Sequence, residues 1–416
     1  MNNKCSLFFL FYISFLFLFA QPLFPIIQGG HFHFLLPYTS FFHEPLINPC
    51  ATLQSSFLAG KGFNARGFNS CKQRVNPLQI FHCSENTVTM LKNYPFTIPS
   101  SCAINTSEYI TMSGSLHHNY SLEYVMRYGL SHGFSLNLYI PVHSMSLNHF
   151  CITNSNPTNS EHSSLSQSET QDFTSKLFHL GDGLCLGNWH QTGLGDVGLL
   201  FEWHEAFPQQ KEVIKRVDLH IQTGFLFPTG IEKNEDLLFS QPFGNDGALG
   251  ILAGGGLDIT LGRNATIGFD ISLLHQSGTV KTRRVKTSQD QTDSLLLTKV
   301  CSYKNPGMSQ QFTLFCSLFD RYQHMRIKIG YLFSKHNKDT LSLLTHAISN
   351  IYINTASSLH EHVLHHMLFE VDYLPKTYHF GSTELSTNCS LFAHVPFKGK
   401  RGLSSALIGA SITLTF

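Results

Sequence analysis

The carboxyl-terminal segment SSALIGASITLTF alternates between apolar residues and small or polar ones. Ile412, Leu414 and Phe416 fall on one face of an extended chain, whereas Thr413 and Thr415 fall on the other. Alternation with a period of two is typical of a β-strand, because successive side chains point to opposite faces. One apolar and one polar face suit a half-buried strand of a soluble sheet. They equally suit a barrel strand with lipid on one side and a polar lumen on the other.

The same alternation recurs along most of the chain. No helical period competes with it over a window of useful length, so the sequence predicts an all-β protein. A soluble β-sandwich would also give alternating strands. The apolar faces, however, carry large residues almost without a charge, while carboxylates, Arg and Lys gather on the polar faces. Ahead of the terminal strand, the pattern predicts strands at 121–130, 134–142, 197–204, 216–225, 248–262, 265–274, 311–319, 324–333, 362–374 and 378–394.

The predicted connections alternate between short and long, which is the pattern of bacterial outer-membrane barrels. The nearest candidate for a strand ahead of 121–130 is 107–116, and it brings the total to twelve, an even number as a single-chain barrel requires. The sequence therefore predicts a transmembrane antiparallel β-barrel of about twelve strands. The short connections are predicted at 131–133, 208–215, 262–264, 320–322 and 374–376, and the long ones at 148–192, 230–246, 278–308 and 336–360.

The amino-terminal residues have the features of a secretory signal. A positively charged start is followed by an almost unbroken apolar run from Leu7 to Ala20. The run has the length of a signal-peptide core and is short for a transmembrane helix. Pro22 and Pro25 interrupt its extension, so the favoured interpretation is a cleaved signal over 1–20. A buried or membrane-anchoring helix is the alternative.

The chain accordingly divides into three predicted parts. Residues 1–20 form the signal peptide, 21–103 an irregular region, and 104–416 the barrel. The irregular region is an extension, a plug, or two further strands that would raise the total to fourteen. No later stretch approaches the length of an apolar membrane-spanning helix. The predicted location is the outer membrane of a bacterial cell.

Composition excludes some classes of function. The formal net charge is +1 and 13% of residues are charged, so the chain is not a strongly basic nucleic-acid binder. Cys50, Cys71, Cys83 and Cys102 cluster before the alternating region, and in an oxidising compartment they can form two disulfides in any pairing. None of them forms a CxxC pair, so a zinc site is not expected, and no cofactor is predicted.

Several short motifs resemble those of known outer-membrane transporters. GLGDVGLLFEW (193–203), which follows a long loop, and TGFLFPTG (223–230) are similar to segments of the outer-membrane transporters linked to phenol degradation, distant relatives of the long-chain fatty-acid transporters. RYGLSHGFSLNLYIPV (127–142) resembles the hairpin in which those proteins join two strands by a GLT-type turn. INPC (47–50) resembles the NPA motif of the fatty-acid transporters' hatch, with Cys50 in place of alanine.

The resemblance implies a function and partners. It implies passive passage or binding of small hydrophobic or amphipathic molecules, without catalysis. The terminal residues Ile412, Leu414 and Phe416 resemble the carboxyl-terminal signal by which the outer-membrane assembly machinery recognises barrels. Membrane lipid, that machinery and a small-molecule solute are the expected partners. The alternative is a structural or surface-adhesion barrel without transport.

Charged residues on the predicted polar faces are the candidates for lining the lumen. One interpretation is a self-neutralising interior network that holds a small barrel shut, because side chains fill most of such an interior. The other is a narrow, polar-rimmed or mildly cation-preferring pathway. The candidates are Glu123, Arg127, Glu202, Arg216, Asp218, Asp258, Asp270, Arg326, Lys328, Glu370 and Asp372.

Two further motifs give weaker alternatives. LHQSG (274–278) resembles the HxSNG motif of outer-membrane phospholipase A, which would make His275 and Ser277 a base and nucleophile. Gly278 stands where that motif has Asn, and no orienting partner can be named, so an enzyme is not predicted. A second cluster contains metal-ligand residue types without a fixed spacing, and no metal site is predicted from it. It comprises His360, His362, His365 and His366, with Glu361 or Glu370. The polar stretch 154–172 is predicted to be an outer loop.

Overall fold

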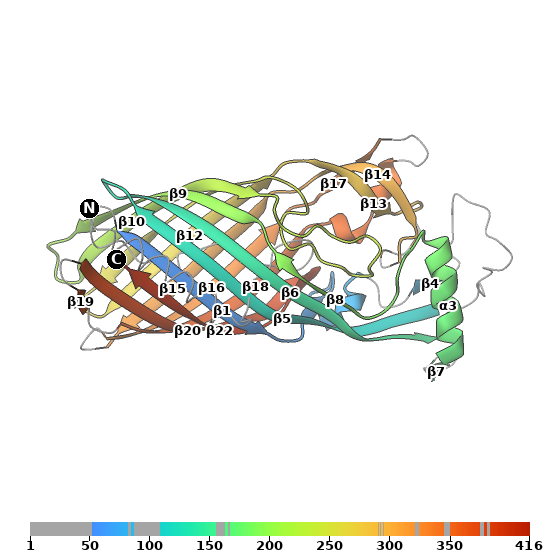
Figure 1. Cartoon of the computed structure of the whole chain (residues 1–416), viewed down its shortest axis with the longest axis horizontal. Helices are drawn as coiled ribbons and strands as arrows, with labels where there is room; N and C mark the ends of the chain where they lie inside the picture. The colour runs from blue at the N-terminus through green and yellow to red at the C-terminus, as the bar shows by residue number, and fades with distance from the viewer. Residues whose placement is uncertain are drawn as a thin grey trace.

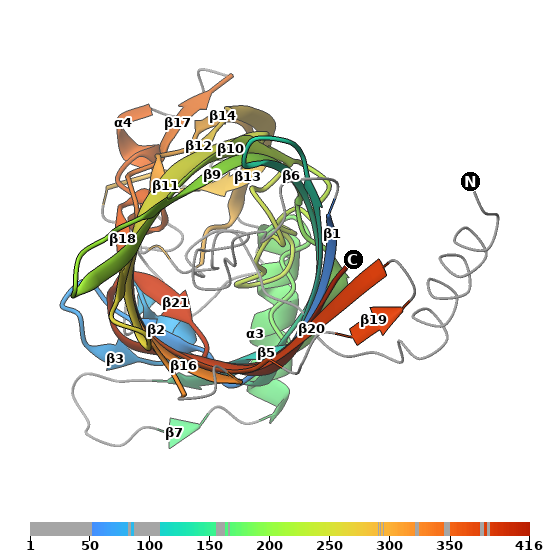
Figure 2. The same ribbon diagram turned by 90° about the vertical axis from the view of Figure 1, so that its left-hand side faces the viewer.

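The computed structural model describes residues 52–81, 85–86, 109–154, 163–164, 167–289, 291, 293, 295–320, 324–344, 350–374, 378–380 and 383–416. Within them, strands dominate and twelve of these close into one antiparallel barrel. Figure 1 shows the barrel from the side, and Figure 2 looks along it and shows the closed ring. The expected signal peptide, the INPC motif, Cys83 and Cys102 lie outside the described residues. Cys71 is described and is a free thiol.

The barrel strands pair in chain order around the ring. The ring closes because β1 pairs with β22 on one side and with β5 on the other. The barrel strands are β1 (Leu53–Gly62), β5 (Tyr109–Gly129), β6 (Phe134–Asn154), β9 (Val197–Pro208), β10 (Ile214–Phe227), β11 (Gly250–Leu261), β12 (Ala265–Gln276), β15 (Ser309–Phe319), β16 (Met325–His336), β18 (His362–Tyr373), β20 (Thr383–Lys400) and β22 (Leu407–Thr415).

The predicted strand number is confirmed, but the predicted position of the first strand is wrong. The described part of this stretch, 109–116, is not a separate strand, because β5 begins at Tyr109 and continues to Gly129. The first strand is β1, which lies in the region expected to precede the barrel. Its less buried face carries Ser55, Ala59 and Lys61 beside larger residues, so its alternation is weak in the sequence.

The outer surface of the barrel is an apolar band. On strand after strand, exposed large side chains alternate with buried ones that face inward, as in β6, β10 and β12. A water-soluble protein rarely exposes so extensive an apolar surface, whereas lipid requires it. The barrel therefore spans a membrane. Members of the band include Leu136, Phe201, Ile221, Phe225, Ile251, Ile267, Phe269, Ile271, Leu314, Ile327, Ile329, Phe369, Ile408 and Ile412.

The two ends of the barrel differ. Short turns join β5 to β6, β9 to β10 and β11 to β12 at one end, here called the short-turn end, where the carboxyl terminus also lies (Figure 1). The opposite long-loop end carries most of the remaining elements. These are β2 (Arg66–Phe68), β3 (Arg74–Val75), β4 (Glu85–Asn86), β7 (Ser163–Ser164), β8 (Trp189–Leu194), β13 (Thr279–Val285), β14 (Thr298–Asn305), β17 (Thr340–Leu343), β21 (Gly402–Ser404), α3 (Gln167–Leu180), α4 (Asn350–Ile353), η2 (Pro77–Gln79) and η4 (Ser357–Leu359), while β19 (Tyr378–Phe380) extends the short-turn end.

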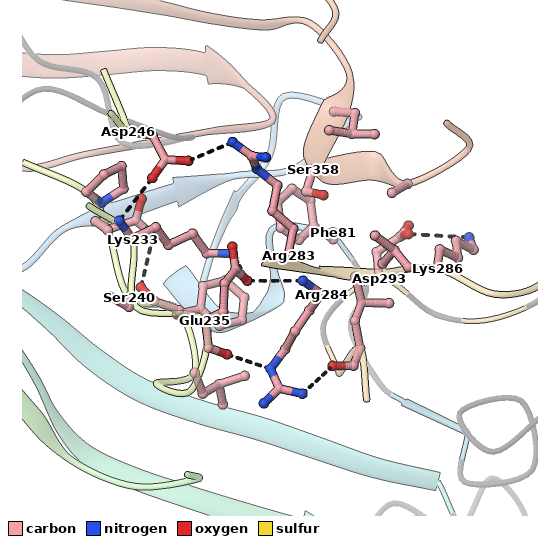
Figure 3. Close-up of a pocket in the computed structure, with 18 of the residues that line it drawn as sticks. Phe81, Lys233, Glu235, Ser240, Asp246, Arg283, Arg284, Lys286, Asp293 and Ser358 are labelled. Carbon is pink, nitrogen blue, oxygen red and sulfur yellow. Dashed lines mark hydrogen bonds and ion pairs between the residues drawn. The ribbon is translucent and has the colours of Figure 1, made fainter. Parts of the chain in front are cut away.

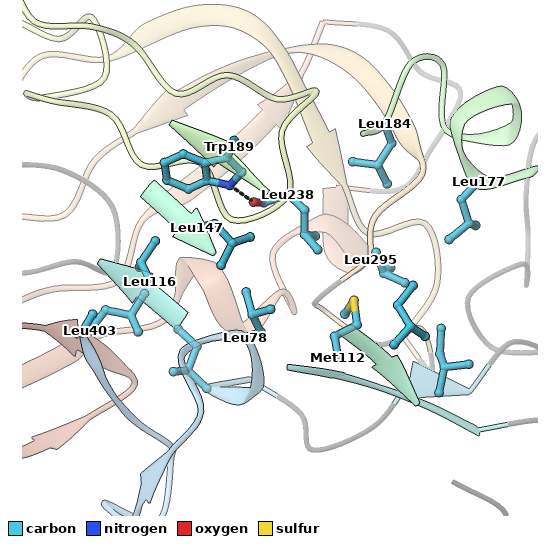
Figure 4. Close-up of a cluster of buried hydrophobic side chains, with 14 of the residues drawn as sticks. Leu78, Met112, Leu116, Leu147, Leu177, Leu184, Trp189, Leu238, Leu295 and Leu403 are labelled. Atoms are coloured by element: carbon cyan, nitrogen blue, oxygen red, sulfur yellow. Dashed lines mark hydrogen bonds between the residues drawn. The ribbon is translucent and has the colours of Figure 1, made fainter. Parts of the chain in front are cut away.

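An apolar core fills the long-loop end. Strands β5 and β6 extend beyond the length that a membrane needs, and their inward residues there are apolar rather than charged. Trp189 packs in this core, and its indole Nε1 donates a hydrogen bond to the carbonyl oxygen of Leu238 at 2.8 Å. Figure 4 shows the cluster, which brings together Leu78, Met112, Leu116, Leu147, Leu177, Leu184, Trp189, Leu238, Leu295 and Leu403.

Helix α3 corrects the prediction of a loop over 154–172, because its first residues lie in that stretch. The amino-terminal half of the helix is polar, so its sequence shows no helical periodicity of apolar residues. Leu177 and Leu180, near its end, are buried in the core with Leu295 and Leu297. Tertiary packing therefore stabilises a helix whose own sequence is a poor guide to it. Among the described residues, none of the helices has the length and apolar character needed to cross a membrane.

Candidate functional site

The barrel interior contains a buried ion pair between β5 and β9. The guanidinium Nη2 of Arg127 donates to the Glu202 carboxylate at 2.7 Å, and both side chains are almost wholly buried. Asn137 donates to the other oxygen of Glu202 at 2.9 Å, and Arg127 Nε donates to the Ser135 hydroxyl at 3.2 Å. The network joins three neighbouring strands from inside.

A second network lies on β9, β10 and β12. Nε2 of His220 is 2.6 Å from the Asp270 carboxylate, and both groups are buried. Asp218 is 2.7 Å from Arg216 Nε and 3.4 Å from His204 Nε2. Arg216 is the most exposed member, at 45% of its side chain, because it lies at the short-turn end. Two of the carboxylates predicted to line the lumen, Asp218 and Asp270, therefore pair with histidines that the prediction did not include.

A third network joins β16 to β18. Arg326 Nε donates to Asp372 at 2.5 Å, and Lys328 Nζ donates to Glu370 at 3.3 Å and lies 4.0 Å from Asp372. The two strands are in register here, with Arg326 opposite Asp372 and Lys328 opposite Glu370. Cross-strand neighbours of opposite charge stabilise such a pair of strands.

Glu123 and Asp258 differ from the other nine candidates because, within the described part of the chain, neither forms an ion pair with a basic side chain. Glu123 shares a hydrogen bond with the hydroxyl of Tyr139. Asp258 lies opposite Gly268 on β12, and its Oδ1 is buried without a hydrogen-bond partner among the described residues. All eleven predicted residues lie on inward faces, and most of their charge is compensated within the barrel.

Sequence reasoning missed a layer of leucines on the inward faces of β9 to β12. Leu200, Leu226, Leu252 and Leu274 form one buried cluster. Each follows a large apolar residue that points outward, so the strands carry two large apolar residues in succession near the long-loop end. That doubling is the sequence signal that could have located the layer, and it occurs at Leu199–Leu200, Phe225–Leu226, Ile251–Leu252 and Leu273–Leu274.

The two transporter-like motifs meet at Asp196, a residue that the site prediction did not include. Asp196 lies between β8 and β9, and its carboxylate accepts hydrogen bonds from the backbone N–H groups of Gly230 at 3.0 Å and Asn245 at 2.6 Å. Burial raises the pKa of Asp196 to about 6. A Cβ at Gly244 would lie 2.3 Å from this carboxylate, so the backbone of the 228–249 loop approaches it closely. Asp196 therefore anchors that loop against the rim of the barrel.

A cavity of about 180 Å³ lies at the long-loop end, between this loop and β13. Figure 3 shows the charged residues that line it, with Arg283 and Arg284 from β13 facing Glu235 and Asp246 from the loop. Much of the remaining lining is apolar. The apolar residues include Ile80, Phe81, Leu237, Phe239, Leu341, Ile353 and Leu359. The cavity is thus amphipathic.

Most charges around the cavity are tightly paired. Lys233 is 2.9 Å from Glu235, and Lys286 is 3.3 Å from Asp293. Arg284 donates to Asp236 at 2.9 Å and to backbone carbonyls, including that of Leu297 at 3.0 Å. Arg283 is the exception, because the nearest carboxylate oxygen in the described part of the chain, on Asp246, is 3.9 Å away.

The residues of the phospholipase-like motif do not form a nucleophile and base pair in the described structure. His275 is exposed on the outward face of β12 and lies opposite Ile251. The Ser277 hydroxyl accepts a hydrogen bond from the backbone N–H of Leu249 at 3.0 Å, which holds it against the loop. In the described structure, no hydrogen bond links the side chains of His275 and Ser277.

The histidine cluster is divided between the two faces of β18. His362 and His366 are buried inside, and His366 lies 2.9 Å from the Ser404 hydroxyl. His365 lies on the outward face and contacts the Tyr331 hydroxyl at 2.6 Å. Within the described ranges, no group of three metal-ligand residues is arranged to hold an ion.

Comparisons with known proteins give likeness of structure only. No family model matches the chain, and no curated protein matches it. An outer membrane channel from Pseudomonas putida F1 is 10% identical, covering 89% of this chain and 97% of that one, with a TM-score of 0.46. A FadL homologue from Pseudomonas aeruginosa is 8% identical over 95% and 97%, at 0.28. The CymD monoaromatic hydrocarbon channel is 10% identical over 88% and 87%, at 0.25.

Proposed function

We propose that the protein is an outer-membrane barrel that binds small hydrophobic or amphipathic molecules and lets them pass without catalysis. The amphipathic cavity at the long-loop end supports this proposal. Sites for small molecules are typically concave and largely apolar, with a few polar groups that fix orientation. In this proposal the long-loop end faces the outside, so a solute meets the cavity before it meets the charged interior of the barrel.

Swelling of liposomes that contain the full chain tests the proposal. Phenylalanine is a suitable solute, because it is amphipathic and crosses lipid slowly, and a sugar of similar size is the polar reference. We expect faster swelling with phenylalanine than with the sugar. Leu341→Trp, which fills the cavity, should slow phenylalanine entry. Leu344→Trp is the matched control, since Leu344 is 56% exposed in the same segment.

A structural barrel without transport is the second candidate. The paired charges of the interior and the apolar core at the long-loop end favour it, because both features fill space that a pathway needs. Equal, background swelling with both solutes would support this candidate and contradict the first. Measuring phospholipid hydrolysis in the same liposomes tests the absence of catalysis, and hydrolysis that Ser277→Ala abolishes would show an esterase.

A further inference from the structure

Arg283 is the residue around the cavity whose charge is least compensated. It lies on β13 with its side chain 4% exposed, on the same face as the buried Val285. Its two terminal nitrogens donate to Thr279 at 2.7 Å and to the carbonyl oxygen of Ser302 at 3.0 Å. Its Nε–H is buried and has no hydrogen-bond partner among the residues that the structure describes. A buried guanidinium with a free donor is costly unless an acceptor is supplied.

The neighbouring carboxylates do not meet this need. Asp246, the nearest, forms a close ion pair with Lys281 and accepts a hydrogen bond from the backbone N–H of Lys233 at 3.0 Å. Glu235 is held by Lys233. Burial lowers the pKa of Arg283, in keeping with a cation that lacks a close counterion.

An apolar surface lies directly beside the guanidinium. Val285, Leu341, Ile353 and Leu359 belong to one buried cluster, and all four line the cavity with Arg283. The cavity of about 180 Å³ is comparable to the roughly 150 Å³ apolar cavity that accepts a benzene molecule in another protein. Its size and lining suit one ring or short chain with one charged group.

We propose that the cavity binds a small amphipathic monoanion, whose carboxylate accepts hydrogen bonds from Arg283 and whose apolar part packs against the Val285 and Leu341 side of the cavity. Guanidinium matches the planar geometry of a carboxylate, which a lysine ammonium does not. The inference rests on the proposed function, and it specifies the sign of charge and the chemical class of the solute.

Calorimetric titration of the full chain in a non-ionic detergent tests the inference. Three probes separate its parts: benzoate carries the ring and the anion, benzamide is its neutral isostere, and acetate has the anion without the ring. We expect the wild-type protein to bind benzoate about tenfold more tightly than benzamide, as for one charge-assisted hydrogen-bonded contact, and about tenfold more tightly than acetate, because acetate buries no ring. This comparison of the three probes uses only the wild-type protein.

Two variants assign the effect to Arg283. Arg283→Gln should weaken benzoate binding about tenfold and leave benzamide binding unchanged, and Arg283→Lys should restore part of the loss. Arg263→Gln is the matched control, because Arg263 is exposed in a turn at the opposite end of the barrel. Heat-modifiable gel migration verifies that each variant is folded.

The possible failures can be told apart. If benzoate and benzamide bind equally, or if Arg283→Gln leaves benzoate affinity unchanged, the monoanion inference is wrong while binding of amphipathic molecules stands. If acetate binds as tightly as benzoate, the site recognises an anion alone, and the amphipathic class is wrong. If the folded wild-type protein binds none of the three, both the inference and the proposed binding role of the cavity are wrong.

Discussion

At the scale of single residues, burial decides which charges matter most. Arg127 and Glu202 satisfy each other in a site with almost no access to water, so either one alone would be a buried, uncompensated charge. The sequence could predict that these residues face inward, because alternation fixes the face of a strand. It could not predict their pairing, because Arg127 and Glu202 come from β5 and β9, which do not pair with each other but lie on either side of β6.

Removing one member of this pair should destabilise the barrel more than removing both. We expect Arg127→Ala to lower the free energy of unfolding by about 3 kcal/mol, whereas the double variant Arg127→Leu with Glu202→Leu should lose less, since no orphan charge remains. Urea unfolding in lipid vesicles measures both. A double variant as unstable as the sum of the two single ones would contradict this account.

Asp196 should make stability depend on pH. Its pKa is raised from 3.8 to about 6, so between these values the folded state holds a proton that the unfolded state has released. The contribution of Asp196 to stability therefore falls as pH rises through that window, by up to about 3 kcal/mol. Asp196→Asn should remove this part of the slope. Comparing unfolding free energies of the two proteins at pH 4 and pH 7 measures it, and parallel profiles would contradict it.

At the scale of elements, the long strands β5 and β6 have two functions. Inside the membrane region their inward residues include charged ones, such as Glu123 and Arg127, and beyond it they are apolar, as at Ile110, Met112 and Leu116. The pairing of β5 with β6 shifts register between His118 and Tyr120, where the buried face of β5 changes from even to odd positions, so the sequence predicted two strands where the structure has one. Helix α3 escaped prediction because its buried leucines contact residues far away in the chain.

Packing of α3 gives a test of the core. Leu177→Ala should destabilise the long-loop end by about 2–5 kcal/mol, because Leu177 is wholly buried. Phe178→Ala, its exposed neighbour at 45%, should have little effect. We expect limited proteolysis to cut the long-loop end of the first variant sooner, with the barrel fragment left intact. Equal cutting of both variants would contradict the role of Leu177.

At the scale of the whole molecule, closure depends on the two ends of the barrel sequence. The backbone N–H of Phe416 donates to the carbonyl oxygen of Leu53 at 2.9 Å, and the N–H of Leu53 donates back at 3.2 Å. The ring of Phe416 is 40% exposed beside this seam, so it adds little to packing. The number of strands and the closure of the barrel could be predicted from the alternation of short and long connections along the sequence. The position of the first strand could not be predicted, because the outward face of β1 mixes small, charged and large residues.

Phe416→Ala should impair assembly more than stability. The resemblance of the terminal residues to an assembly signal predicts several-fold less folded barrel in the outer-membrane fraction of cells, with a nearly unchanged unfolding midpoint for the purified, refolded protein. Phe207→Ala is the control, since Phe207 is exposed to a similar extent, at 44%, near the short-turn end of β9. An equal yield of both variants would remove support for Phe416 as a signal.

The pairing of β1 with β22 also has a kinetic consequence. Neighbouring hairpins can form locally and early, but this seam joins segments from opposite ends of the described chain, and contacts so distant in sequence form slowly. Until they form, the sheet is an open ribbon with two edges whose backbone groups can pair with another chain. The protein is therefore prone to aggregate while the sheet is still open, and pairing of β22 with β1 removes the exposed edges.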